Sequence, residues 1–594
     1  MRKYPIVLLI LFAAMALAQS VTTVELYGPV VAGDVYNGLG TNITPTNQWE
    51  YQAAQAAHIT WGRNDATWYA NELQTCPANT SGGYSLSSAL STGLGYGLTY
   101  GVKPVWTADY GPPYCAIATG TVTSNVSIGA TVVPITISTG SLSGVVGGQT
   151  CLALSSGWIS SKHGYCGTLI ASVAGTNITL TTAATEALSS GAALTVNLLL
   201  YPPVLVTPGT SYTANASVQA YYNYAHFLAS QLTANSVTGQ IELWNEPPWP
   251  DECWDAGTNC YDTPPAVAAI YSGFGLELPG NVSSHTPTTG ATWANGYTGK
   301  SGDGSLFNPG YFTSYPAGTT IQKNVGAESI HPYGNNPEDN NWLPACIHQY
   351  NSYTNILNNC TPTGANTGSN WKWEAAYNAF PYTFGGLKEQ VTETGLMLNQ
   401  SPAPTNTQVT RWEMRQFLAF QGSGVTPVLF YRLYDTSGQG FGWCTSSTGP
   451  TCYPVYTAFT NLMADIGTIA STPVAPYSSC LMPRVSSYTG YFPLATMMFV
   501  GSQAANKANS LLYYTYQRSY TASNWISLTS PASVNVSVVV PAGLTVSSVK
   551  DMVTSSAVSY TFTSQTLTYP VADDPIEALL VPTSSTTSPT LTCT

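Results

Sequence analysis

One stretch of the sequence decides the fold prediction: Ile241-Glu242-Leu243-Trp244-Asn245-Glu246-Pro247. Its first four residues are typical of a short buried strand, and polar residues follow directly where that strand ends. Just upstream, residues 218–232 have the period of an amphipathic helix. A helix followed by a buried strand is the repeating unit of a βα series, in which the polar strand ends gather on one face.

The same alternation of strands and helices extends on both sides of this stretch. Upstream we expect a strand end at residues 35–38, a helix at 48–57, and strands at 59–63 and 102–106. Downstream, a helix is expected at 409–420, and the strand candidates are residues 292–294, 328–330, 390–392 and 428–430. The count approaches eight βα units, which predicts a (β/α)8 TIM barrel.

Two regions break this series. Residues 117–200 have no helical period and read as short Val, Ile and Thr strands separated by Gly and Ser, which predicts an inserted β module. Residues 478–594 are also β-rich, and a valine recurs there at every second position from Val534 to Val540. The predicted class is therefore α/β: a signal peptide over 1–18, a (β/α)8 catalytic barrel over 19–116 and 201–477, the inserted module over 117–200, and a C-terminal β-sandwich over 478–594.

The first residues have the order of a secretory signal. Arg2 and Lys3 precede an apolar run over residues 6–17, and Ala18 ends a small-residue cleavage site. The run is shorter than the roughly 20 residues that cross a bilayer. We therefore expect a secreted protein with no membrane partner.

The cysteines also fit export. There are 12 of them, and an even number in an exported chain predicts disulfides. The sequence leaves their connectivity open, and the simplest local pairing joins Cys76 to Cys115, Cys151 to Cys166, Cys253 to Cys260, Cys346 to Cys360, Cys444 to Cys452, and Cys480 to Cys593.

Composition excludes several classes of partner. Only 7% of the residues are charged, against about 25% in ordinary domains. The formal net charge is −12, and no Lys/Arg cluster follows the signal, so nucleic acid is not an expected partner. No cysteine or histidine spacing of a zinc site occurs, and neither metal nor cofactor is expected. The net charge of a surface with so few charged groups changes little with pH, which suggests that the protein works in acidic surroundings. The sequence does not predict the oligomeric state.

Three motifs place polar residues at predicted strand ends. The first is Asn245-Glu246-Pro247, at the end of the stretch quoted above. The second is residues 390–395, Gln-Val-Thr-Glu-Thr-Gly, which contains Glu393, and the third is residues 330–333, Ile-His-Pro-Tyr. Arg63 ends the predicted second strand.

Together these motifs resemble those of the large clan of TIM-barrel retaining glycosidases that includes β-xylosidases, β-glucuronidases, cellulases and β-galactosidases. The resemblance covers the barrel and neither β module. It implies that Glu246 is the acid/base, that Asn245 holds the sugar 2-hydroxyl, and that Glu393 is the nucleophile. It also implies that Tyr333 donates a hydrogen bond to the nucleophile and that His331 positions the acid/base region.

The resemblance gives Arg63 the role of supporting the nucleophile, since its guanidinium stays charged and holds a carboxylate in its ionised form. The eighth strand departs from the clan, because many members end it with a Trp under the sugar, whereas residues 429–435 here contain none. Tyr431, or Trp443 from the following loop, is the expected replacement, since either ring can stack on a sugar face.

Three other carboxylates lie in or at the ends of predicted strands. Glu242 shares a strand face with Glu246, and we expect it to form a structural ion pair, with Arg63 as the candidate partner, rather than to act in catalysis. Asp65 and Asp109 also end predicted strands, and either can bind a hydroxyl.

The expected function is that of a secreted retaining glycoside hydrolase, which cleaves O-glycosidic bonds in oligo- or polysaccharides by double displacement. Retention requires two carboxyl groups about 5 to 5.5 Å apart. The resemblance implies that Glu246 and Glu393 end strands four and seven of one barrel, which would place them across the same pocket. Two alternatives are a non-catalytic carbohydrate-binding or cell-surface protein on a barrel scaffold, and a protein whose β modules anchor it to a wall polymer. The presence of both glutamates favours the enzyme.

Overall fold

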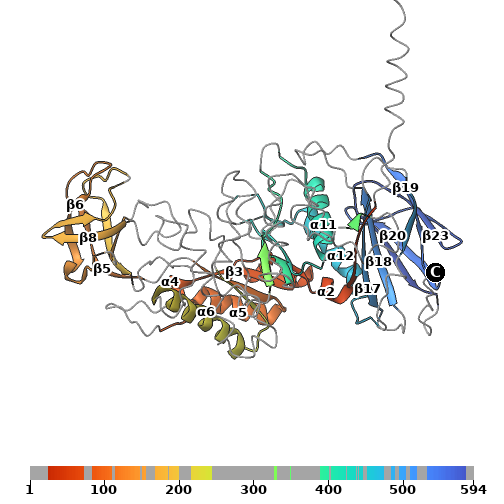
Figure 1. Ribbon diagram of the computed structural model, residues 1–594, viewed down its shortest axis with the longest axis horizontal. Helices are drawn as coiled ribbons and strands as arrows, with labels where there is room; N and C mark the ends of the chain where they lie inside the picture. Colours follow the sequence, from red (N-terminus) through yellow and green to blue (C-terminus); the bar gives the residue numbers. More distant parts are fainter. Residues whose placement is uncertain are drawn as a thin grey trace, which may run out of the picture.

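The structure is a computed structural model, and Figure 1 shows its ribbon. It describes residues 24–71, 83–109, 114–147, 150–154, 168–184, 186–199, 216–243, 327–330, 348–349, 388–399, 403–422, 424–435, 438, 440–445, 451–473, 483–488, 494–503, 509–517 and 531–583. Within these ranges the chain is of the α/β class and forms three parts, each with its own sheets.

The first part is a seven-stranded sheet in the order β11-β4-β3-β2-β15-β14-β12. All of its strand pairs are parallel. The strands are β2 (Leu39–Asn42), β3 (Trp61–Thr67), β4 (Lys103–Asp109), β11 (Gln240–Leu243), β12 (Ala327–Ile330), β14 (Lys388–Val391) and β15 (Val428–Phe430). The last strand of this set in the chain, β15, pairs with the first, β2, while β11 and β12 are the edges within the described residues.

Helices alternate with these strands. They are α2 (Ala32–Tyr36), α3 (Gln48–Ala56), α4 (Trp68–Asn71), α5 (Ser88–Tyr100), α6 (Ala216–Ala234), α11 (Asn406–Gly422) and α12 (Pro454–Gly467). Local sequence sets their ends: the Ser87 side chain caps α5 by accepting from the Leu90 N–H, and Gly101, with φ of +74°, ends it. The helices predicted at 48–57, 218–232 and 409–420 are confirmed.

The expected strand end at residues 35–38 is wrong. Helix α2 occupies this position, and the strand begins only at Leu39. A short apolar pair such as Val35-Tyr36 fits either period, and Val35 is buried as part of the helix. The candidate strand at 292–294 lies outside the described residues.

The second part is a closed six-stranded barrel that follows β4 in the chain, with the strand order β10-β5-β6-β9-β8-β7. Its strands are β5 (Tyr114–Val122), β6 (Val132–Gly140), β7 (Thr150–Leu154), β8 (Thr168–Ala174), β9 (Asn177–Leu180) and β10 (Ala193–Leu199), with a short η1 (Leu142–Gly144). Its interior is filled by aliphatic side chains such as Ile135, Leu152 and Ile178, all fully buried. This β structure lies in the region expected to be inserted, although it begins three residues before residue 117.

The third part contains two further sheets, in the orders β13-β1-β17-β18-β24-β20-β21 and β16-β19-β23-β22. The strands are β1 (Val24–Val31), β13 (His348–Gln349), β16 (Arg484–Tyr488), β17 (Leu494–Ser502), β18 (Asn509–Gln517), β19 (Val534–Val539), β20 (Leu544–Asp551), β21 (Ser556–Ala557), β22 (Thr561–Thr563), β23 (Thr566–Val571) and β24 (Ile576–Pro582). Both sheets contribute to one apolar core, in which Val536 and Val538 of β19 are fully buried.

Strand β1 differs from the sequence-based division of the chain. It pairs in parallel with β17, so residues 24–31 belong to the third part, whereas the prediction placed 19–116 in the barrel. A strand pattern near the N-terminus does not specify which sheet the strand joins, because the pairing partner is more than 400 residues away in sequence. Within the described residues, the chain therefore passes through the C-terminal part, as β1, before it enters the parallel sheet.

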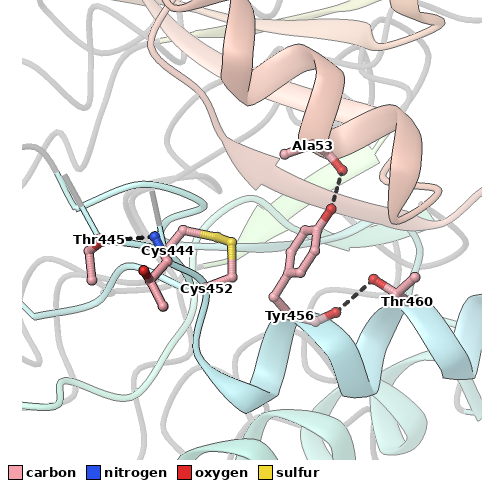
Figure 2. The surroundings of a disulfide bond; sticks show 7 residues. Ala53, Cys444, Thr445, Cys452, Tyr456 and Thr460 are labelled. Atoms are coloured by element: carbon pink, nitrogen blue, oxygen red, sulfur yellow. Dashed lines mark hydrogen bonds between the residues drawn. A yellow bond between two sulfur atoms is a disulfide. The ribbon is translucent and has the colours of Figure 1, made fainter. Parts of the chain in front are cut away.

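One predicted disulfide, Cys444–Cys452, is formed and joins the segment after β15 to the start of α12. Figure 2 shows it beside Tyr456, whose hydroxyl donates to the backbone oxygen of Ala53 at 2.9 Å. Cys151 is also disulfide-bonded. Each of the other predicted pairs has at least one cysteine outside the described residues. Among the described helices, none is both long enough and apolar enough to cross a membrane.

Candidate active site

The structure describes one half of the predicted site. Asn245, Glu246, His331 and Tyr333 lie outside the described residues. Glu393 and Arg63 are described, together with the two aromatic residues that were expected to support the sugar. The described geometry is therefore that of the predicted nucleophile and its surroundings.

Glu393 lies just beyond the end of β14, on the edge where the parallel strands end. The last residue of β2, Asn42, lies beside Arg63 of β3 in the sheet register. Both residues donate to the same carboxylate oxygen of Glu393, Oε1: Arg63 through Nη1, and Asn42 through Nδ2 at 3.2 Å. The Glu393 side chain keeps 13% of its surface exposed, so the carboxylate is held in place and still reaches solvent.

Arg63 is fixed on its other side by a buried ion pair. Its Nε donates to Oε2 of Glu242 at 2.5 Å, and the side chains of the two residues are only 2% and 0% exposed. Glu242 also accepts from Thr107 Oγ1 at 3.0 Å and from Thr392 Oγ1 at 2.8 Å. Buried charges are tolerated when they are paired and hydrogen-bonded in this way. The ion pair predicted for Glu242 and Arg63 is confirmed.

The charge of Arg63 is permanent. Burial alone would lower the pKa of its guanidinium, but the negative charges of Glu242, Glu393 and Asp65 together raise that pKa well above its ordinary value. A cation that cannot be lost favours the ionised form of the carboxylate it contacts. Arg63 thus links a structural carboxylate to one that is accessible for chemistry.

Tyr431, the first candidate platform, lies next to Glu393. It follows β15 directly, and its backbone N–H donates to the backbone oxygen of Thr394 at 2.6 Å. Burial raises the pKa of its hydroxyl, and the negative charge of Glu393 raises it further. Its ring is partly exposed and meets Phe441 edge to face at 5.6 Å between centroids. Tyr431 therefore remains a candidate to contact substrate.

Trp443, the other residue expected to stack on the sugar, is buried in the core, so this prediction is wrong. It is 1% exposed, its ring stacks on Phe459 at 4.6 Å, and its Nε1 donates to Oε2 of Glu413 at 2.6 Å. Both ring faces belong to the core between the sheet and helix α12, so neither is open to a sugar. An aromatic residue after a strand does not reveal in sequence which side of the sheet it will cover.

Helix α11 fixes the segment that follows Glu393. Gln416 accepts from Thr394 Oγ1 at 2.9 Å, and Glu413 Oε1 accepts from the Leu396 N–H at 3.2 Å. Between them, Gly395 has φ of +154°, and a Cβ there would lie 2.7 Å from the backbone oxygen of Tyr431. Only glycine fits this close approach, which explains the Gly that ends the motif at 390–395.

Two further polar residues belong to the site: Asn42, which the sequence analysis missed, and Asp65, which it named as a candidate. Asn42 was not singled out for the site, although its place at the end of the first parallel strand is a signal that could have found it. Asp65 is exposed, and its charge acts on both Arg63 and Tyr431, so it faces the same region. It remains a candidate for binding a hydroxyl; the side chain of Asp109 is not described. Within the described residues, no group of three or more His, Cys, Asp or Glu could hold a metal ion.

In the glycosidase reaction expected from the sequence, replacing Arg63 by Lys should lower kcat/KM by roughly 100-fold or more, because one ammonium cannot reproduce two directed hydrogen bonds to two carboxylates. Steady-state kinetics on activated aryl glycosides measures the loss. Arg411→Lys is the matched control, since Arg411 also joins two carboxylates, Asp573 and Asp574, but away from the site. Equal effects of the two substitutions on kcat/KM would show that Arg63 has only a structural role.

No protein-family model and no curated protein matches this chain. Several solved structures are similar. A family 39 glycoside hydrolase from Bacteroides cellulosilyticus WH2 is 13% identical, with a TM-score of 0.48 over 93% of this chain and 82% of that chain. CelM2, a bifunctional glucanase-xylanase from a metagenome library, is 12% identical, with a TM-score of 0.46 over 95% and 99%. AbfB, a family 51 α-L-arabinofuranosidase from Bifidobacterium longum, is 9% identical, with a TM-score of 0.42 over 95% and 100%. At this degree of likeness, an activity for the present chain has to be argued from its own residues.

Proposed function

We propose that this protein is a secreted retaining glycoside hydrolase, with Glu393 as nucleophile and Glu246 as acid/base. The observation that carries the proposal is the setting of Glu393: a carboxylate at the carboxyl edge of a parallel sheet, partly open to solvent, held through one oxygen by Arg63 and Asn42. An accessible carboxylate that is paired with a cation and fixed in orientation is what a nucleophile for an anomeric carbon requires.

Strand order supports a (β/α)8 barrel. Neighbours in the sheet are neighbours in the chain, and the last strand, β15, pairs with the first, β2. A doubly wound open sheet keeps its first strand inside and places its last strand at an edge. In this proposal the two edge strands, β11 and β12, belong to the same closed barrel. Glu246, three residues beyond β11, would then face Glu393 across the carboxyl end.

The chemistry takes two steps. In the first, an oxygen of Glu393 attacks the anomeric carbon, the bond to the leaving oxygen breaks, and Glu246 gives that oxygen a proton. In the second, water attacks the same carbon, Glu246 accepts a proton from the water, and the glycosyl ester breaks and returns its electron pair to Glu393. Each step inverts the anomeric centre, so the product retains its configuration.

The remaining roles follow the same scheme. Asn245 would hold the sugar 2-hydroxyl, while His331 and Tyr333 would position the two glutamates. Tyr431 would contact the sugar face, and Asp65 would accept from a hydroxyl. Oligo- or polysaccharide is the proposed substrate. Export is supported by the Cys444–Cys452 disulfide, because such bonds persist in oxidising surroundings.

The purified protein should hydrolyse at least one member of a panel of aryl glycosides, and NMR of the first product should show the anomeric configuration of the substrate. An inverted product would contradict the retaining mechanism. Binding of polysaccharide without turnover would favour the carbohydrate-binding alternative. Protein recovered from the culture medium also tests export, because cleavage after Ala18 leaves Gln19 as the N-terminal residue.

A further inference from the structure

We propose that Asn42 is a positioning residue for the nucleophile: its amide holds Oε1 of Glu393, so that the other carboxylate oxygen attacks the anomeric carbon. This inference rests on the proposed function and assigns to Asn42 a role that the sequence motifs do not contain.

Geometry places Asn42 beside the residue that already supports Glu393. Strands β2 and β3 are parallel neighbours, and their register pairs Asn42 with Arg63. The two side chains converge on one oxygen, with Asn42 Nδ2 at 3.2 Å from Glu393 Oε1. Arg63 supplies charge, and Asn42 supplies a second, neutral N–H from another strand. Two donors from different strands fix the rotation of a carboxylate better than one donor does.

The orientation of the Asn42 amide supports a functional role. Its Oδ1 is buried and accepts no hydrogen bond from any residue that the structure describes. Rotating the amide by half a turn would place this oxygen against the Glu393 carboxylate, where two acceptors repel each other. Buried amide oxygens normally find a partner, and leaving one without costs stability. The Asn42 side chain therefore donates a hydrogen bond to Glu393, while its own Oδ1 accepts none from the described residues.

The contact has a consequence for both chemical steps. With Oε1 engaged by two donors, the bond to the anomeric carbon forms from Oε2, and Oε1 becomes the carbonyl oxygen of the glycosyl ester. The same N–H groups donate to that carbonyl oxygen, and they stabilise the carboxylate that re-forms when water displaces the sugar. Asn42 therefore acts on the nucleophile in the free enzyme and on the leaving carboxylate in the second step.

The test compares Asn42→Ala and Asn42→Asp with a matched control, Asn64→Ala. Asn64 follows Arg63 on β3, and its amide donates to the backbone oxygen of Ile43 at 2.7 Å rather than to Glu393. For Asn42→Ala we expect kcat to fall roughly 10- to 100-fold with KM changed less than about threefold, as for the loss of one hydrogen bond to a charged group. The acid limb of the kcat/KM profile should move to higher pH by about one unit, because the ionised carboxylate loses a donor.

Asn42→Asp gives a distinct signature. Its carboxylate would face Glu393 at neutral pH, so activity there should fall further than in Asn42→Ala, and it should recover partly in acid as the introduced group gains a proton. A structural role would produce neither a moved acid limb nor recovery in acid. An acid limb that is unchanged in Asn42→Ala, or moved equally in Asn64→Ala, would overturn the inference.

A second readout does not depend on turnover. NMR of protein labelled with ¹³C at the glutamate carboxyls follows the ionisation of Glu393, and Glu393→Gln assigns its signal. We expect ionisation at higher pH in Asn42→Ala than in the wild type, and unchanged ionisation in Asn64→Ala. Absence of that difference contradicts the role of Asn42, whereas a wild type that cleaves no glycoside but shows the difference contradicts only the proposed function.

Discussion

Replacing Glu393 by Gln should lower turnover of activated aryl glycosides by roughly 10⁴-fold or more, with the fold retained. Gln has nearly the same size and keeps a carbonyl oxygen that can accept from Arg63 and Asn42. Its amide cannot form the glycosyl ester, and it removes the negative charge that stabilises a cationic anomeric centre. The loss should therefore fall on kcat, while thermal unfolding changes little. Steady-state kinetics and a thermal melt of the same preparation measure the two quantities.

A second variant separates loss of the nucleophile from loss of structure. In Glu393→Gly a small anion such as azide can occupy the space of the missing carboxylate and attack the anomeric carbon once. The product should be a glycosyl azide of inverted configuration, because one displacement replaces two. Glu186→Gln, an exposed carboxylate on the closed six-stranded barrel, is the control and should keep full activity. Glu393→Gln activity within about tenfold of wild type would place the nucleophile elsewhere.

Much of this site could be predicted from the sequence because strand ends are visible in it. A buried apolar run followed by a polar residue predicts a side chain on the carboxyl edge of a parallel sheet, and Glu393, just beyond β14, obeys that rule. Arg63 and Glu242 instead lie within β3 and β11, because β3 continues to Thr67 and β11 to Leu243. The ion pair between Arg63 and Glu242 could also be expected, because a chain with only 7% charged residues offers a buried arginine few possible partners. The alternation of valines with other residues in β19 is also a local sequence pattern, and Val536 and Val538 are buried as that pattern predicts.

The rest depended on contacts between distant parts of the chain. Trp443 was expected at the sugar, but packing against Phe459 of α12 decides its burial, and nothing within a few residues of it reveals that contact. Asn42 acquires its role only when β2 and β14 lie on either side of β15. Likewise β1 reads as an ordinary strand, and only β17 determines its sheet. Hydrophobic periodicity and residue propensity predict which segments form helices and strands. The burial of Trp443, the role of Asn42 and the sheet that β1 joins depend instead on tertiary contacts.

The protein should also be markedly more stable in acid than in base. Three carboxyl groups, of Glu50, Glu413 and Glu577, are 0 to 1% exposed, and each has a raised pKa: about 7 for Glu50 and about 8 for the other two. Burial is the largest cause in each case, because it penalises the charged form. Partial compensation comes from donors, such as the Thr44 N–H to Glu50 at 3.2 Å and the Tyr514 hydroxyl to Glu577 at 2.8 Å.

The sign of the pH dependence follows from these directions. In the unfolded chain these glutamates lose their protons near pH 4.5, whereas in the folded protein they keep them until about pH 7 to 8. Between these limits the folded state binds more protons, so the free energy of unfolding falls as pH rises. Each group contributes a slope of at most about 1.4 kcal/mol per pH unit. His58 acts in the opposite sense, because burial lowers its pKa, but it is one group against three.

We therefore expect the midpoint of thermal unfolding to be higher at pH 5 than at pH 8 by roughly 5 °C. Calorimetry or circular dichroism at constant ionic strength measures the difference. Glu413→Gln and Glu577→Gln should each flatten the dependence between pH 5 and 8, since an amide carries no proton to lose, whereas the exposed Glu186→Gln should leave it unchanged. A midpoint that rises from pH 5 to pH 8 would show that the buried carboxyls are ionised in the folded protein. The predicted trend means that the fold is most stable where these buried glutamates are protonated. Together with a composition of only 7% charged residues, it suits a protein that works in acidic surroundings.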